Sequence, residues 1–278
     1  MRRTFALLLT GALLHVAAAP AFAQSDTINA RKTPLFTLAD AALFGGFAIA
    51  TVAVAPLDRH YAVALQNPSR QADKFYSKSA TIVRSVADPG AIIIGVSMYT
   101  AGRLTHNARA ADLGWHGTEA VIAGGTLGAL IKGLAGRARP YKSVGDPNPH
   151  DYQFLRGFTG GSDYQSFPSG HTIAAFAAAS AVSSETGRWW PNTRWLIGPV
   201  MYGGASLVGV SRMYNNKHWA SDVMTGALIG TFAGLKTVRY HHTHPGNRLD
   251  RWLLGASITP NASGGSNVSF TITPKSGY

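Results

Sequence analysis

The sequence predicts an all-α protein: an antiparallel bundle of about six helices, followed by a short C-terminal tail that resembles a β-hairpin. Apolar segments rich in Ala and Gly recur along the chain, each bounded by charge, Pro or Gly, and none alternates with a period of two. Hydrophobic residues make up 46% of the 278 residues and charged residues 14%, which excludes a disordered chain. Cysteine is absent, which excludes a disulfide scaffold, a zinc–thiolate site and a cysteine nucleophile.

The elements are expected in the following order. Residues 1–23 have the pattern of a secretory signal peptide, because Arg2 and Arg3 precede an apolar stretch that ends in the cleavage pattern Ala21-Phe22-Ala23. A helical domain follows over residues 24–248, with Gly- and Pro-rich loops at 141–168 and 243–248. Its helices are expected at about 36–56, 86–102, 117–136, 171–184, 198–212 and 218–240. Residues 249–278 form the tail, with two short strands around a turn.

The uncharged runs are short for membrane spans. A spanning helix needs about 20 apolar residues, whereas Asp40 and Asp58 bracket 17 residues, and Glu119 and Lys132 bracket 12. The expected location is therefore periplasmic, either soluble or membrane-associated. An integral inner-membrane bundle is the alternative, because short Ala/Gly helices can pack in lipid. The net charge of +12 favours anionic partners, but export and the lack of a basic stripe with interleaved aromatics argue against nucleic acid.

Two motifs suit the binding of a phosphate group. Lys132 and Arg139 are seven positions apart, so on one helix both would point to the same side near its end. A Pro-Ser-Gly-His sequence then begins the next helix, with Ser169 as the expected N-cap. The backbone N–H groups of Gly170 and His171 would form an anion cradle there. Each motif alone also fits an ordinary helix end.

A third motif supplies a candidate nucleophile. Arg212 ends one helix, and His218 and Asp222 lie four residues apart at the start of the next, so their side chains should meet. A carboxylate on one imidazole nitrogen would fix the tautomer and make the other nitrogen more nucleophilic. The same face continues as a small-residue stripe that should pack closely against a neighbouring helix: Gly226, Gly230 and Gly234.

In combination and in this order, the three motifs resemble the signatures of the type-2 phosphatidic acid phosphatase family, which shares its site with class A acid phosphatases and vanadium haloperoxidases. The resemblance covers about residues 117–240. It implies an exported, metal-independent phosphatase that hydrolyses phosphate monoesters or pyrophosphates, of lipids or of small molecules. It also implies that His218 forms a phosphohistidine, Asp222 orients it, and His171 protonates the leaving oxygen and then activates water. The residues implied to hold the phosphate oxygens are Lys132, Arg139, Ser169, Gly170 and Arg212.

No metal or cofactor is expected, and two other functions stay open. A vanadium haloperoxidase would hold vanadate in the same cradle, and a non-catalytic module would only bind anionic lipid. Arg137 could contact substrate or be solvated. His241, His242 and His244 are expected to form a solvated helix end, because no carboxylate or cysteine framework accompanies them in the sequence. Substrate selection is expected to lie outside the motifs, in residues 24–116 and 141–166.

Overall fold

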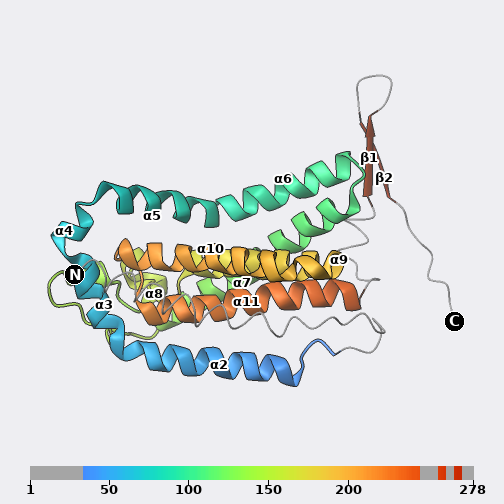
Figure 1. Cartoon of the computed structure of the whole chain (residues 1–278). Helices are drawn as coiled ribbons and strands as arrows, with labels where there is room; N and C mark the ends of the chain where they lie inside the picture. The colour runs from blue at the N-terminus through green and yellow to red at the C-terminus, as the bar shows by residue number, and fades with distance from the viewer. Residues whose placement is uncertain (1–33, 245–255, 261–265, 271–278) are drawn as a thin grey trace.

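A computed structural model of the chain describes residues 34–244, 256–260 and 266–270. The longer helices are α2 (Leu38–Val54), α5 (Lys74–Ala87), α6 (Gly90–Leu104), α7 (Ala108–Ala135), α9 (Gly170–Trp189), α10 (Arg194–Tyr214) and α11 (Ala220–Thr243). Shorter ones are α3 (Asp58–Gln66), α4 (Pro68–Gln71) and α8 (Arg156–Thr159). Figure 1 shows α9, α10 and α11 side by side, with α2 on one flank and α5 and α6 on the other.

The all-helical prediction is confirmed, and each of the six expected segments contains a helix. The expected count of about six is too low, because the described residues contain further helices. The segment expected over 86–102 begins only at Gly90, and a separate helix, α5, precedes it. Asp73 starts α5 by accepting the backbone N–H groups of Phe75 at 2.9 Å and Tyr76 at 3.3 Å.

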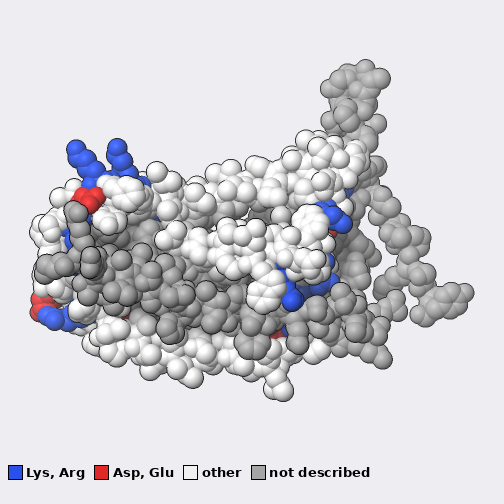
Figure 2. Space-filling view, in the orientation of Figure 1, with Lys and Arg blue, Asp and Glu red and all other residues white. Residues whose placement is uncertain are grey.

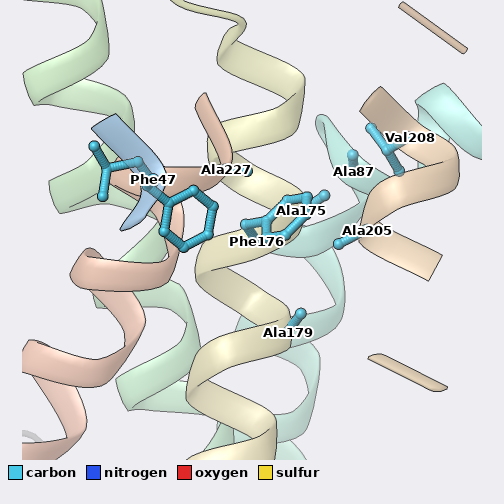
Figure 3. Close-up of a cluster of buried hydrophobic side chains, with 9 residues drawn as sticks. Phe47, Ala87, Ala175, Phe176, Ala179, Ala205, Val208 and Ala227 are labelled. Carbon is cyan, nitrogen blue, oxygen red and sulfur yellow. The ribbon is translucent and has the colours of Figure 1, made fainter. Parts of the chain in front are cut away.

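Helix α9 occupies the centre of the bundle, and small side chains let its neighbours approach. Ala175, Phe176 and Ala179 of α9 belong to a cluster of buried apolar side chains that also includes Ala205 and Val208 of α10 (Figure 3). Phe47 of α2 and Ala87 of α5 complete its link to the two flanks. Burial of this kind is the main favourable contribution to folding.

The predicted glycine stripe of α11 packs directly on α9, as expected. A Cβ atom at Gly226 would lie 2.7 Å from the carbonyl oxygen of Ser169, and one at Gly234 would lie 2.5 Å from Cβ of Ser180. A Cβ at Gly230 would overlap the carbonyl oxygen of Ile173. These distances leave no room for a side chain, so the stripe fixes how closely α11 can approach α9.

An apolar belt, made of large apolar side chains exposed on several helices, lies between two charged ends of the bundle. Figure 2 shows Lys and Arg at both ends of the visible face and an uncharged middle. Two stretches, Leu38–Gln66 and Ala108–Lys142, are long and apolar enough to cross a membrane, and the bent pair of α5 and α6 would make a third. The large apolar side chains exposed on α2, α6, α7 and α10 include Leu38, Ile49, Val52, Ile93, Ile94, Ile122, Leu127, Leu130, Leu196 and Val200.

The charges that shorten the uncharged runs do not interrupt this belt. Asp40 is 7% exposed and pairs with Lys236 and with Arg239, the latter at 3.3 Å. Asp58 is 1% exposed. Because both carboxylates face the interior, counting residues between them underestimates the apolar length of the outer surface.

In the tail, β1 (Ala256–Pro260) pairs antiparallel with β2 (Ser266–Phe270), with Ile258 opposite Val268. The expected turn and the remainder of the tail lie outside the described residues, so the hairpin as a whole stays a prediction. The expected signal peptide over residues 1–23 also lies outside them, as does the boundary at residue 248.

Candidate functional site

The three motifs meet at one end of the bundle. The first spans the end of α7, the second begins α9, and the third joins the end of α10 to the start of α11. Adjacent helices run in opposite directions, so these four helix ends lie at the same level (Figure 1). Short hydrogen bonds between the motifs, described next, fix their relative positions.

Lys132 and Arg139 are not on one continuous helix, which corrects the expected spacing argument. Gly136, with φ +53°, caps α7 in the left-handed conformation, and the chain leaves the helix before Arg139. Arg139 is instead held by the segment before α9, because its backbone N–H donates to the carbonyl oxygen of Asp163 at 2.9 Å. Its Nε donates to the carbonyl oxygen of Ser162 at 2.7 Å.

Lys132 links the first motif to the second. Its Nζ donates to the carbonyl oxygens of Gln165, at 3.0 Å, and Pro168. Its Cε would lie 3.5 Å from a Cβ atom at Gly170. The ammonium group is therefore placed beside the first residue of α9, where the dipole and the free N–H groups of the helix favour an anion.

Ser169 occupies the N-cap position of α9, but its side chain does not cap the helix. The hydroxyl is buried and accepts a hydrogen bond from Oγ1 of Thr172 at 2.8 Å. The backbone N–H of Ser169 donates to the carbonyl oxygen of Asp222 at 3.0 Å, which ties the start of α9 to the first turn of α11. The expected cap is thus replaced by a serine whose backbone joins the second and third motifs.

His171 lies in the first turn of α9, surrounded by positive charge. Burial lowers the pKa of His171 to about 3, and four nearby cations act in the same direction: Arg212, Arg84, Lys132 and Arg139. The imidazole is therefore neutral at neutral pH in the empty site. An anion bound among the same cations would oppose their effect on the pKa of His171.

His218 is 3% exposed and lies in the turn between α10 and α11. Its Nδ1 lies 2.6 Å from the carbonyl oxygen of Ser166, so this nitrogen carries the proton and Nε2 is left for attack. Burial lowers the pKa of His218 to about 3, against the opposite effect of the Asp222 carboxylate. The imidazole is thus neutral at neutral pH.

Asp222 does not make the expected hydrogen bond to His218. Its Oδ2 is 3.7 Å from Nδ1 of His218, and instead accepts from Oγ of Ser166 at 2.5 Å and from the backbone N–H of Trp219 at 2.9 Å. Burial would raise the pKa of Asp222, but Arg137 and the hydrogen-bonded neighbours lower it to about 2. Asp222 is in the first turn of α11, where accepting the N-cap N–H draws the carboxylate away from the imidazole.

Arg137 is neither solvated nor free to contact substrate. It is 3% exposed, and Nη1 donates to Oδ1 of Asp222 at 2.5 Å. Nη2 donates to Oδ2 of Asp58 at 2.8 Å and to the carbonyl oxygen of Pro149 at 2.7 Å. Asp58 also accepts the backbone N–H of Ser221 at 2.9 Å and its hydroxyl at 2.5 Å. Arg137 thus holds Asp222 in place.

Two residues of this network were missed by sequence reasoning. Asp58 comes from α3, in a region where no motif was recognised, and Ser166 immediately precedes the second motif. The uncharged stretch before Asp58 was used only as a measure of span length. A lone carboxylate at the end of an uncharged stretch indicates a buried ion pair, since a carboxylate that is buried when the helix packs needs a partner.

Arg212 lies in the last turn of α10 and is 4% exposed. Its Nε has no hydrogen-bond partner among the described residues. A buried guanidinium group with an unused donor is costly unless an anion satisfies it. The structure therefore brings together Lys132, Arg139, Gly170, His171, Arg212 and His218, and leaves one buried donor available.

The histidines near the end of α11 are not a solvated helix end, which corrects the expectation for His241 and His242. His241 is 3% exposed, and its Nε2 is 2.5 Å from Oε2 of Glu119. Nε2 of His242 lies 2.9 Å from Oε2 of Glu185. The carboxylates come from α7 and α9, so the sequence around α11 gave no sign of them. Only His244 is exposed.

Sequence comparison finds known phosphatases that are similar to the part of the chain that carries the three motifs. Residues 113–245 match the sequence model of the PAP2 superfamily. A lipid A 1-phosphatase of Porphyromonas gingivalis is 42% identical over 87 residues, which is 31% of this chain and 19% of that protein. An undecaprenyl-diphosphatase of Sulfolobus acidocaldarius is 27% identical over 46% of this chain and 54% of its own length. The chain thus spans between about a fifth and about half of these curated relatives.

A solved structure shows the same fold. The crystal structure of a transmembrane PAP2-type phosphatidylglycerolphosphate phosphatase from Bacillus subtilis superposes with a TM-score of 0.54. The superposition covers 75% of this chain and 98% of that one, at 19% sequence identity.

Proposed function

Residues 113–245 match the sequence model of the PAP2 superfamily, and on that premise we propose that the protein is a member of this superfamily and a phosphatase that hydrolyses phosphate monoesters or pyrophosphates of lipids through a phosphohistidine intermediate. The observation that carries this proposal is a pair of buried groups at the same end of the bundle: Arg212, whose Nε lacks a partner among the described residues, and His218, whose Nδ1 is already hydrogen-bonded. A bound phosphate group would accept a hydrogen bond from Nε of Arg212, and its phosphorus atom would be the target of Nε2 of His218.

The first step is the transfer of the phosphoryl group to His218. Nε2 attacks phosphorus, and the bond from phosphorus to the leaving oxygen breaks. His171, protonated once the phosphate dianion offsets the surrounding cations, gives its proton to the leaving oxygen. Nδ1 keeps its proton on the carbonyl oxygen of Ser166 throughout. In the second step neutral His171 takes a proton from water, and the resulting hydroxide displaces His218.

Asp222 supports this step without touching the nucleophile directly. Its ionised carboxylate lies 3.7 Å from Nδ1 of His218, close enough to stabilise the positive charge of a phosphohistidine. It also accepts the hydroxyl hydrogen of Ser166, whose carbonyl oxygen holds the imidazole. We therefore assign Asp222 an electrostatic and positioning role rather than a direct hydrogen bond.

The cations bind the equatorial oxygens, where charge gathers in the transition state. Lys132 reaches the start of α9 from α7, Arg212 reaches it from α10, and Arg139 reaches it from the loop that follows α7. The N–H of Gly170 and the buried hydroxyl of Ser169 complete the set. Losing one such donor typically costs about 3–4 kcal/mol of barrier. We propose that these groups replace a metal ion at this site and that no cofactor takes part in the reaction.

We propose a lipid phosphate or pyrophosphate as the substrate and a membrane as the location. The relatives named above are a lipid A 1-phosphatase and an undecaprenyl-diphosphatase, and the apolar belt with two candidate spans fits a bundle embedded in lipid. Resistance of the full chain to extraction from membranes by alkaline carbonate would support embedding, whereas release would favour a surface-bound protein. Export stays a prediction.

The decisive test is the covalent intermediate. Full-length protein in detergent is assayed with a chelator present against phosphatidate, isoprenyl pyrophosphate and p-nitrophenyl phosphate, and rapidly quenched for acid-labile phosphoprotein. We expect vanadate-inhibited activity and a phosphoenzyme that is absent in His218→Ala. His150→Ala, which changes an exposed histidine, is the control and should behave as wild type. Full activity in His218→Ala would refute the mechanism. Halide oxidation with vanadate and peroxide, without phosphatase activity, would favour a haloperoxidase.

A further inference from the structure

A second cluster of ionisable side chains lies at the other end of the bundle. His116 is on α7, Glu185 on α9 and His242 on α11. Along α7, His116 precedes Lys132 by 16 residues, which at 1.5 Å per residue is about 24 Å. Along α9, Glu185 follows His171 by 14 residues, or about 21 Å. The cluster is therefore separate from the phosphate site and is not used by the mechanism.

The three side chains converge on a small volume. Their potential ligand atoms all lie within 4.8 Å of one another. Nδ1 of His116 is 2.5 Å from Oε1 of Glu185, and Nε2 of His242 is 3.0 Å from the same oxygen. The exposed fractions of the side chains are 3% for His116, 0% for Glu185 and 25% for His242. Two sides of the cluster are thus closed, and the side at His242 is open to solvent.

The ring of His116 is held in a fixed orientation. His241 stacks on it with ring centroids 4.1 Å apart and planes at 13°. His241 is itself anchored by Glu119, at 2.5 Å from Nε2. Ordered neighbours of this kind orient an imidazole ligand before any ion binds.

The charge balance requires a cation at this point. Glu185 is fully buried, and a buried carboxylate is costly unless a positive charge compensates it. A divalent ion would compensate the charge and use all three groups as ligands. The competing occupant is a proton, which would leave an imidazolium hydrogen-bonded to the carboxylate.

We propose that His116, Glu185 and His242 form a binding site for a divalent transition-metal ion, with Zn²⁺ as the best fit. Two imidazole nitrogens and one carboxylate oxygen are a donor set typical of zinc, with the fourth position open to water. Zinc bonds of about 2.0–2.2 Å place neighbouring ligand atoms about 3.3 Å apart in a tetrahedron. The two atoms now 2.5 Å apart would separate by less than about 1 Å to receive the ion. Because the site joins α7, α9 and α11 far from the phosphate site, its role is to hold the bundle together.

The test measures binding of Zn²⁺ alone to the full-length chain in detergent, without a polyhistidine tag. The protein is stripped with a chelator, loaded with Zn²⁺, freed of unbound ion by gel filtration and analysed for zinc. We expect equimolar zinc in wild type and at least a tenfold loss in both His242→Ala and Glu185→Gln. His244→Ala is the matched control, because it removes an exposed histidine two residues away on the same helix end. It should retain zinc.

Two further readouts separate a built site from incidental binding. Zn²⁺ should raise the Tm of wild type and of His244→Ala but not of His242→Ala. Co²⁺ should give the visible absorption of a tetrahedral site in wild type and in His244→Ala only. Absence of retained zinc in wild type would overturn the proposal. Equal retention in His242→Ala would also overturn it. In either case the cluster would be a proton-bridged His–Glu–His contact.

Discussion

Replacing Asp58 by Asn tests the buried network behind the nucleophile. The Asp58 carboxylate accepts three hydrogen bonds: from Arg137 at 2.8 Å, and from the backbone N–H and hydroxyl of Ser221 at 2.9 and 2.5 Å. Both carboxylate oxygens are used, but an amide has only one acceptor oxygen. In either orientation the new NH₂ group therefore faces a donor. Arg137 keeps its hydrogen bonds to Asp222 and to the carbonyl oxygen of Pro149, so it loses only part of its interactions.

The expected destabilisation follows from these contacts. Breaking one partner of a buried ion pair costs about 3–5 kcal/mol, and the remaining partners of Arg137 favour the lower end. At about 2–4 °C per kcal/mol for a chain of this size, Asp58→Asn should lower the Tm by about 6–12 °C. Since Asp58 acts on the site through Arg137 and Ser221 and is not among the groups proposed to hold the phosphate, kcat should fall while KM stays close to that of wild type.

Thermal unfolding in detergent, together with steady-state kinetics, measures both effects. Asp146→Asn is the matched control, because Asp146 pairs with Arg59 at 2.7 Å but both side chains are mostly exposed. An exposed pair contributes little, so its Tm should stay within about 2 °C of wild type. Equal shifts for Asp58→Asn and Asp146→Asn would refute the reasoning, and so would a change in KM alone.

Three further results are expected. Gly230→Ala should lower the free energy of unfolding by about 1–3 kcal/mol, because the added methyl group forces α11 away from α9. Gly203→Ala is the control and should be neutral or stabilising, because its methyl group meets open space. Similar Tm values for the two variants would contradict the packing argument. Arg212→Ala should reduce kcat about 10²–10³-fold, with Arg194→Ala, at the opposite end of α10, as an unaffected control. Vanadate should raise the pKa of His171 from about 3 in the empty site, because a bound anion offsets the surrounding cations; a histidine NMR titration that shows no rise would rule out its role as general acid.

The sequence predicted the parts of the site that depend on local chain geometry. The approximate ends of α7 and α10 and starts of α9 and α11 follow from apolar periodicity and from the bounding Gly, Pro and charged residues, and the glycine stripe of α11 follows from spacing alone. Small residues four apart must share a helix face, whatever the rest of the fold does. These predictions needed no knowledge of which helices are neighbours.

The missed features all depend on partners far away in the chain. Asp58 and Arg137 are 79 residues apart, and Glu185 and His242 are 57 residues apart. Spacing also predicted that Asp222 would bond to His218, but Arg137 and Ser166 compete for the same carboxylate and hold it away. The short uncharged runs underestimate the apolar outer surface for the same reason, since Asp40 faces inward to Lys236 and Arg239.

The contact between Asp58 and Arg137 limits which segment of the chain could be transplanted into another protein. The segment that matches the PAP2 superfamily begins at residue 113, but one of the two carboxylates that pair with Arg137 lies 55 positions earlier, on α3. Loss of Arg137 would leave two buried carboxylates, Asp58 and Asp222, without their ion pair, and loss of Asp58 would leave Arg137 with only one of its two ion pairs. The pair should therefore be inherited as a single unit, and a chimera that transplants only residues 113–245 must find a substitute carboxylate in its new N-terminal half. The smallest interchangeable piece of this protein is thus larger than the segment by which its family is recognised.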